Sequence, residues 1–141
     1  MPQTDYTAYA PAAPYFDLVR QALGDAVEGE HFFDIVAPDI AYEVLYDFPG
    51  WPRLTPGRAA LMDAFRGYVQ HIALASTSDL VVHRADNGCV FVLEYEVHGT
   101  ILTTGRPYHN RFCSIVTITN RKIVHWRDYM DSLAAWNALT A

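Results

Sequence analysis

The chain has 141 residues, of which 51% are hydrophobic, and a formal net charge of −6. Its ten Lys and Arg residues are scattered, which excludes the basic patch that binding to nucleic acid phosphates requires. With two cysteines and no run near the roughly 18 apolar residues of a membrane span, we expect a cytoplasmic protein without disulfides that neither enters a membrane nor is exported.

The first part of the chain carries helical periodicity. Residues 1–13 are rich in Tyr, Ala and Pro, and we expect a flexible lead-in before a single domain over residues 14–141. The first helix is predicted to begin at Pro14, because apolar residues then recur at helical spacing: Phe16, Val19, Leu23 and Val27. The segment EHFFDIV predicts a short second helix that ends before Pro38.

A strand and a third helix follow. Residues 40–48 are rich in aromatic and β-branched side chains and are closed by Pro49-Gly50, which predicts a strand entering a loop over residues 51–57. Apolar residues on one helical face then predict a helix over about residues 57–73: Leu61, Met62, Phe65, Tyr68, Val69 and Ile72.

After this helix the period changes from helix to strand. Four segments predict sequential antiparallel strands: 79–84, 89–99, 107–119 and 122–131. The segment SLAAWNAL predicts a closing helix. Helices first and meandering strands afterwards indicate an α+β fold, in which the helices cover one face of a curved antiparallel sheet.

One acid lies on an apolar face of the last strand. In VHWRDYMD, the side chains of Val124, Trp126, Asp128 and Met130 share a face because strand side chains alternate with a period of two. Ionising a carboxyl there costs free energy unless a partner or ligand compensates. Asp128 is therefore either a structural acid, paired with Arg111 or a backbone donor, or a functional acid that projects into a pocket.

The order of elements and four segments together resemble the SnoaL-like polyketide cyclases of the nuclear-transport-factor-2-like (NTF2-like) superfamily, which also holds ketosteroid isomerases and limonene-epoxide hydrolases. The segments are IVAPDIAYEVLYDFPG, PGRAALMDAF, GRPYHNRF and KIVHWRDYMDSLAAW. The resemblance implies a cone-shaped, strongly bent sheet that wraps the helices and encloses an apolar pocket. It also implies a homodimer through the outer sheet face, and neither a metal nor an organic cofactor.

The resemblance also bears on Asp128. Limonene-epoxide hydrolases carry a WRDYFD motif whose catalytic Asp matches Asp128, so we expect this residue to move a proton. With a two-residue hairpin loop at 120–121, Asp128 faces Cys113 and shares its face with His109 and Arg111. His109 then shuttles a proton or donates to a developing oxyanion, unless it is an exposed strand histidine. A slip of one residue would bring in other neighbours instead: Asn110, Phe112 and Ser114.

Asp47, at the end of the first predicted strand, is a second candidate for catalysis. The matching region holds the catalytic Asp in ketosteroid isomerases and a water-positioning Asn in epoxide hydrolases, although the alignment requires an insertion. The alternative is an Asp that caps the turn before Pro49.

The expected pocket draws on several elements. Its lining is predicted to include Tyr42, Tyr46, Trp51, Phe65, Arg111, Cys113, Trp126 and Met130, with core packing as the alternative for Tyr42, Tyr46 and Trp51. The six histidines show no HxxxH or similar spacing, so no metal site is expected.

Some of the catalytic residues of these relatives have no match in this sequence. The isomerases carry an oxyanion-binding Tyr on helix one, but the matching positions here are about Val19 and Arg20, and Tyr15 lies at least a turn away. The epoxide hydrolases use an Arg-x-Asp strand motif, and the nearest match here is Glu94-Tyr95-Glu96.

We therefore expect a cofactor-free acid/base enzyme that acts on a hydrophobic small molecule bearing a carbonyl or epoxide, by cyclisation, double-bond migration, dehydration or hydrolysis. The alternatives are a non-catalytic binding domain for a hydrophobic metabolite and a dimeric interaction module, because this superfamily hosts all three. The expected partners are a small hydrophobic ligand and a second copy of the chain, and neither nucleic acid nor a membrane.

Overall fold

The computed structural model describes residues 5–140, in which one curved sheet packs against the helices. The strands are β1 (Val36–Val44), β2 (Leu54–Pro56), β3 (Ile72–Ala85), β4 (Val90–Ile101), β5 (Pro107–Thr119) and β6 (Lys122–Met130). The helices are α1 (Ala13–Leu23), α2 (Phe32–Ile35), α3 (Arg58–Tyr68) and α4 (Ser132–Thr140), with short 3-10 turns η1 (Thr7–Ala12), η2 (Gly24–Ala26) and η3 (Asp86–Gly88).

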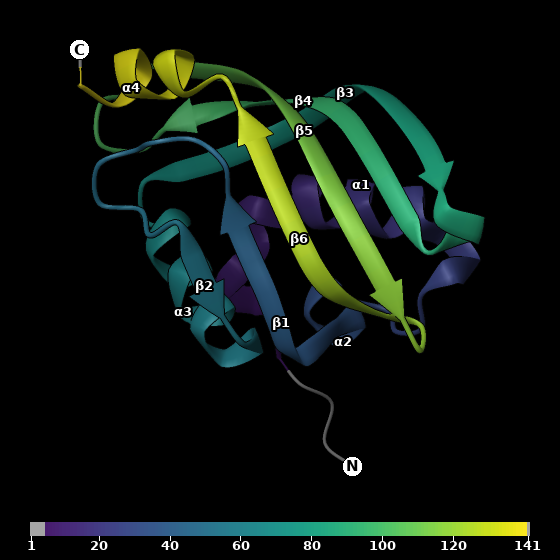
Figure 1. The fold of residues 1–141 in the computed structure, drawn as a ribbon. Coiled ribbons are helices and arrows are strands. Elements are labelled where there is room, and N and C mark those ends of the chain that lie inside the picture. The colour runs from purple at the N-terminus through teal and green to yellow at the C-terminus, as the bar shows by residue number, and fades with distance from the viewer. Residues whose placement is uncertain (1–4, 141) are drawn as a thin grey trace.

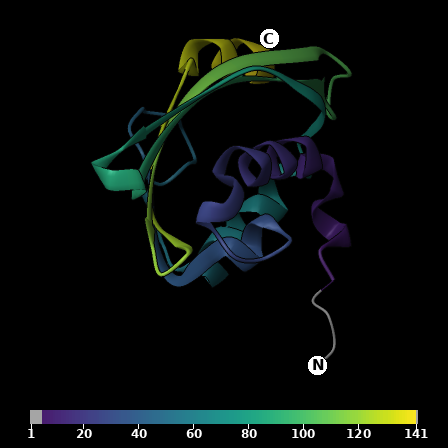
Figure 2. The same ribbon diagram turned by 90° about the vertical axis from the view of Figure 1, so that its right-hand side faces the viewer.

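The six-stranded sheet has the order β2-β1-β6-β5-β4-β3 (Figure 1). Figure 2 shows it as an arc with α1 on the concave side, while α4 lies across one end. This confirms the predicted α+β class, a curved, mainly antiparallel sheet wrapped around N-terminal helices. No helix within residues 5–140 combines the length and the apolar character needed to cross a membrane.

Residues 7–12, within the expected lead-in over residues 1–13, form the 3-10 turn η1. Residues 1–4 of that lead-in lie outside the described residues, but η1 packs on the core and buries Tyr9 and Ala12. Helix α1 has Pro14 in its first turn and ends at Leu23, and the φ of 52° at the following Gly24 suits a residue without a side chain.

Strand β1 begins at Val36, before the predicted start at residue 40, and ends at Val44 rather than at residue 48. Its pairing with β6 is parallel, and the register shifts between Val36 and Ala41. Pro38 falls within this irregular stretch, where a residue without an N–H donor is tolerated. The segment predicted as a loop also contributes β2, which pairs with the other edge of β1.

Helix α3 ends at Tyr68, before the predicted end at residue 73. Ile72, predicted on the helix, instead opens β3 and pairs with Ile101 at the far end of β4. Local periodicity could not predict this, because an apolar residue just beyond a helix fits both the helix and the strand that follows. The pairing with β4 is what places Ile72 on the strand.

The β5–β6 hairpin has the predicted loop but not the preferred register. Thr119 pairs with Lys122, and the loop residues 120 and 121 both have positive φ, as a tight hairpin turn requires. The register then shifts beyond Ile118, because Val124 is an extra residue on β6 and forms a β-bulge. Asp128 consequently pairs with Ser114, and the prediction that it faces Cys113 is wrong.

The close approach of β3 and β4 depends on Gly99. A Cβ atom at this position would lie 2.8 Å from the Cα atom of Leu74 and still closer to the carbonyl oxygen of Ala73, so the two strands would have to separate. We expect Gly99→Ala to lower the free energy of unfolding by about 3 kcal/mol.

Gly67 on α3 provides a matched control, because a Cβ there meets nothing within 4 Å. Gly67→Ala should leave the free energy of unfolding unchanged or raise it by up to roughly 1 kcal/mol. Urea denaturation of both variants measures the difference, and equal effects would contradict the role given to Gly99.

Candidate active site

A cavity of about 430 Å³ opens on the concave side of the sheet. Its walls come from α1, α3, α4, the inner faces of β3–β6, the end of β1 and the loop that follows it. The lining is mostly aromatic and aliphatic: Tyr15, Tyr42, Tyr46, Phe48, Gly50, Trp51, Pro52, Asp63, Ala64, Phe65, Gly67, Tyr68, His71, Ile72, Leu74, Val97, Tyr108, Phe112, Asp128, Met130, Ala135 and Leu139.

Asp128 is the buried acid of this cavity, with 3% of its surface exposed. Its Oδ1 atom accepts a hydrogen bond from the Ser114 hydroxyl at 2.6 Å and another from the Trp126 indole N–H at 3.0 Å. Burial raises the pKa of Asp128 to about 6, and these two hydrogen bonds keep it from rising further.

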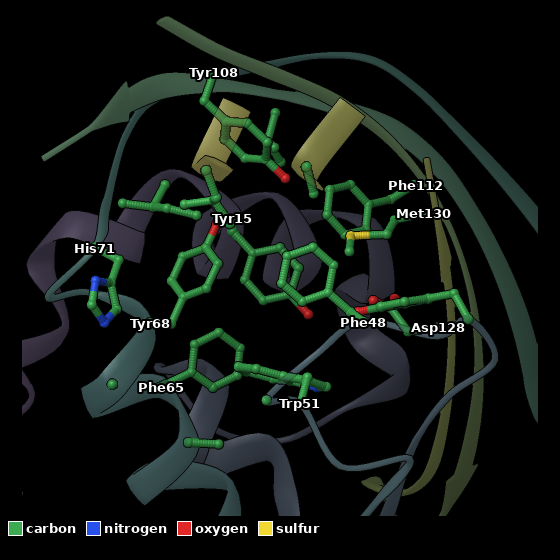
Figure 3. Close-up of a pocket in the computed structure, with 18 of the residues that line it drawn as sticks. Tyr15, Phe48, Trp51, Phe65, Tyr68, His71, Tyr108, Phe112, Asp128 and Met130 are labelled. Carbon is green, nitrogen blue, oxygen red and sulfur yellow. The ribbon is translucent and has the colours of Figure 1, made fainter. Parts of the chain in front are cut away.

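No cation among the described residues neutralises this carboxylate. The other ionisable groups on the lining, apart from the tyrosines, are Asp63 and His71, and in Figure 3 His71 lies at the opposite end of the view from Asp128. Asp63 is on the surface and pairs with Arg66. Within residues 5–140, no three His, Cys, Asp or Glu side chains gather closely enough to hold a metal ion.

Tyrosine hydroxyls provide most of the remaining polarity. Burial raises the pKa of Tyr108 to about 12 and raises the pKa of Tyr15, Tyr42 and Tyr68 well above the usual value, so all of them stay protonated at neutral pH. These tyrosines are therefore hydrogen-bond donors to whatever occupies the cavity.

The Tyr15 hydroxyl is buried without a hydrogen-bond partner among the described residues. The Tyr42 hydroxyl lies close to it, and a hydrogen-bonding interaction between the two hydroxyls acts to raise the pKa of Tyr15 and to lower that of Tyr42, although their geometry is not that of a full hydrogen bond. Because a buried unpaired donor is costly, this hydroxyl suits a ligand acceptor. Tyr15 is not among the residues predicted for the site from the sequence, although its helical spacing with Leu18 and Val19 places it on the buried face of α1.

Six of the residues predicted for the catalytic site or the pocket lining do line the cavity: Tyr42, Tyr46, Trp51, Phe65, Asp128 and Met130. Trp126 does not line it and lies fully buried, where it stacks on Tyr42 with ring centroids 5.8 Å apart. Its contribution to the site is the hydrogen bond to Asp128.

Three predicted neighbours of Asp128 lie on the opposite, outer face of the sheet. The bulge at Val124 moves the register by one residue, which turns His109, Arg111 and Cys113 away from the cavity. His109 is exposed, and its Nδ1 lies 2.8 Å from Nδ1 of His98. The predictions that His109 assists Asp128 and that Arg111 and Cys113 line the pocket are therefore wrong.

Asp47 is also outside the cavity. Strand β1 ends at Val44, and the chain that follows turns Tyr46 and Phe48 toward the lining while the Asp47 side chain remains 87% exposed. Its carboxylate pairs with Arg53 on the surface. The structure thus brings neither predicted partner, His109 or Asp47, to Asp128.

Comparison with known proteins agrees with this architecture. The SnoaL-like domain family matches residues 15–126. The uncharacterised protein YesE of Bacillus subtilis (strain 168) is 29% identical over 98 residues, which are 67% of this chain and 67% of YesE.

Solved structures share the fold at low sequence identity. A protein from Bacillus subtilis assigned as an isomerase superposes with a TM-score of 0.73 at 22% identity and covers 96% of this chain and 95% of its own. A phenazine biosynthesis-related protein from Pseudomonas aeruginosa has a TM-score of 0.68 at 18% identity, with 99% and 89% covered. A protein from Xanthomonas campestris pv. campestris assigned as a polyketide cyclase has a TM-score of 0.67 at 22% identity, with 95% and 96% covered. Because the family match spans most of the chain, the protein belongs to the SnoaL-like domain family, and these solved structures share its fold.

Proposed function

We propose that the protein is a cofactor-free acid/base enzyme acting on a hydrophobic small molecule that bears a carbonyl or an epoxide, with Asp128 as the proton-transferring group. The observation that supports this most strongly is a buried carboxyl on the wall of an apolar cavity, which no cation within residues 5–140 neutralises. Its pKa of about 6 leaves it mostly ionised at neutral pH and still able to take a proton.

For a carbonyl substrate, the proposed step is removal of a proton from the carbon next to the carbonyl. The C–H bond breaks, the proton moves to Asp128, and the electron pair left on carbon spreads onto the carbonyl oxygen. The Tyr15 hydroxyl, which has no partner with full hydrogen-bond geometry among the described residues, is suited to donate to this developing oxyanion. Return of the proton at another carbon would give isomerisation, and attack of the carbon on a second carbonyl would give cyclisation.

A binding protein for a hydrophobic metabolite would share the apolar cavity but would not need a buried acid beside it. Placing a carboxyl there costs folding free energy, which favours a chemical role over simple retention of the ligand. The assigned activities of the solved structures with this fold, isomerase and polyketide cyclase, are compatible with a proton-transfer enzyme.

We also propose a cytoplasmic location for the protein. Cys89 and Cys113 are both free, and Cys89 is exposed, which suits a reducing compartment.

We further propose a homodimer through the outer face of the sheet. This face carries exposed apolar side chains such as Val81 and Tyr129, next to Glu94 and Arg111, which have charges of opposite sign. A second copy could cover the apolar residues and pair the charged ones.

Val81→Lys tests the proposed dimer, because a lysine at a covered apolar position would bring a larger side chain and a charge that must be desolvated into the interface. Sedimentation velocity should show a dimer for the wild type and a monomer for Val81→Lys. Leu133→Lys is the control, since Leu133 is an exposed apolar residue on α4, and it should leave the dimer intact. A wild type that sediments as a monomer would contradict the proposal.

Asp128→Asn tests the proposed reaction. We expect the wild type to catalyse exchange of the α-hydrogens of benzylacetone for deuterium in D₂O, or hydrolysis of styrene oxide, as measured by NMR. The Asn variant should lose about 10²-fold or more in rate, because it cannot take up the proton. Asp47→Asn makes the same chemical change on the exposed loop and should retain the rate. Equal rates in the wild type and Asp128→Asn would rule out the assigned role.

The pH dependence of stability tests the burial of Asp128. Its folded pKa of about 6 lies above the unfolded value of 3.8, so its contribution to stability is fully present below about pH 4 and is lost as the pH rises through 6. The loss amounts to roughly 3 kcal/mol by pH 7.

Asp128→Asn should remove this component and be at least as stable as the wild type at pH 7. An Asn can keep both hydrogen bonds, because both go to Oδ1. Urea denaturation of the two proteins at pH 4, 5, 6 and 7 gives the difference directly. A variant that is less stable at pH 7 by several kcal/mol would show instead that Asp128 is a paired structural carboxylate.

A further inference from the structure

The two oxygens of the Asp128 carboxyl have different surroundings. Both hydrogen bonds from the protein, those of Ser114 and Trp126, end on Oδ1. No described residue donates to Oδ2. The carboxyl is on the cavity wall, so Oδ2 is the oxygen left for a ligand.

The bond to Ser114 continues to a second hydroxyl. The Ser114 Oγ atom lies 2.9 Å from the Tyr95 hydroxyl oxygen, and both side chains are buried. Ser114 has one hydroxyl hydrogen, and an ionised Asp128 can only accept. Ser114 therefore donates to Oδ1, and Tyr95 must donate to Ser114. Tyr95 stays a donor because burial, together with the nearby Asp128 charge, raises its pKa well above the usual value.

We propose that Tyr95 is a positioning residue that acts on Asp128 through Ser114, and that Oδ2 of Asp128 is the atom that receives the substrate proton. This inference rests on the proposed function. The transfer breaks the substrate C–H bond, forms an O–H bond at Oδ2 and leaves the electron pair on the substrate.

The hydrogen bonds to Oδ1 do not have to change when the proton moves to Oδ2. When Oδ2 gains the proton, Oδ1 becomes the carbonyl oxygen of the neutral acid and still accepts from Ser114 and Trp126. The three donors keep their directions before and after proton transfer, so little reorganisation is needed. The same bonds are stronger to the ionised form, which holds the carboxyl in the state that can take a proton.

Tyr95→Phe tests the inference with little structural change. It removes one hydroxyl and keeps the ring, which stacks on Phe112 with centroids 5.5 Å apart and planes at 3°. We expect the pKa of Asp128, measured from the pH dependence of its side-chain ¹³C NMR signal, to rise by on the order of half a unit. Ser114→Ala removes the direct bond and should raise this pKa by about one unit.

The rate of α-hydrogen exchange should change with pH according to the pKa of Asp128 in each variant. At pH 5 the ionised fraction of Asp128, and with it the rate, should fall about tenfold in Ser114→Ala, whereas at pH 8 the rates should be nearly equal. Ser114→Thr, which keeps the hydroxyl, should restore both the pKa and the pH profile. Tyr129→Phe is the control, because Tyr129 is next to Asp128 in the chain but exposed on the outer face, and it should change neither.

An unchanged pKa of Asp128 in both Tyr95→Phe and Ser114→Ala would overturn the inference. So would a rate loss that is equal at pH 5 and pH 8, because a purely structural role would lower the rate without moving the pH profile. If the wild type catalyses no exchange or hydrolysis, the proposed function fails and the assignment of Oδ2 fails with it. The NMR measurement needs no substrate, and it still decides whether Tyr95 acts on Asp128.

Discussion

The register of the β5–β6 hairpin is the constraint on which the site depends. The bulge at Val124 places Ser114 opposite Asp128, and Ser114 provides the hydroxyl that binds its carboxyl. Without the extra residue, Cys113 would hold that position, and a thiol is a much weaker donor. The carboxyl would then be buried with the Trp126 indole N–H alone, at a higher cost in folding free energy. The extra residue Val124 thus lowers the free-energy cost of burying the Asp128 carboxyl.

The electrostatics of the cavity follow from what surrounds that acid. Two neutral donors stabilise the charge of Asp128 only in part, so burial remains the dominant influence on its pKa. A nearby Arg or Lys would have lowered the pKa and stabilised the fold, but it would also have weakened the base. The cavity tyrosines add donors without adding charge, because burial keeps their hydroxyls protonated.

The shape of the sheet explains why a cavity exists beside this acid. The sheet curves around α1 (Figure 2), and the cavity is lined by the inner face of the sheet together with α1, α3, α4 and the loop after β1. Aromatic side chains from these separate elements line the remaining space, so the lining is assembled from residues far apart in the sequence. The outer face of the same sheet carries His109 and Arg111, which strand alternation keeps away from the cavity.

The sequence by itself determined the α+β class, the order of most elements and the place of Asp128 on an apolar face, because these depend on local periodicity and turn residues. Only the tertiary structure decided which residues face Asp128. A bulge belongs to a pair of strands and leaves no clear signal in either one, so Cys113 is predicted opposite Asp128 where the structure has Ser114. The roles open to Tyr15 and Tyr95 likewise depend on α1 packing into the arc and on the register of β4 against β5, neither of which local periodicity encodes.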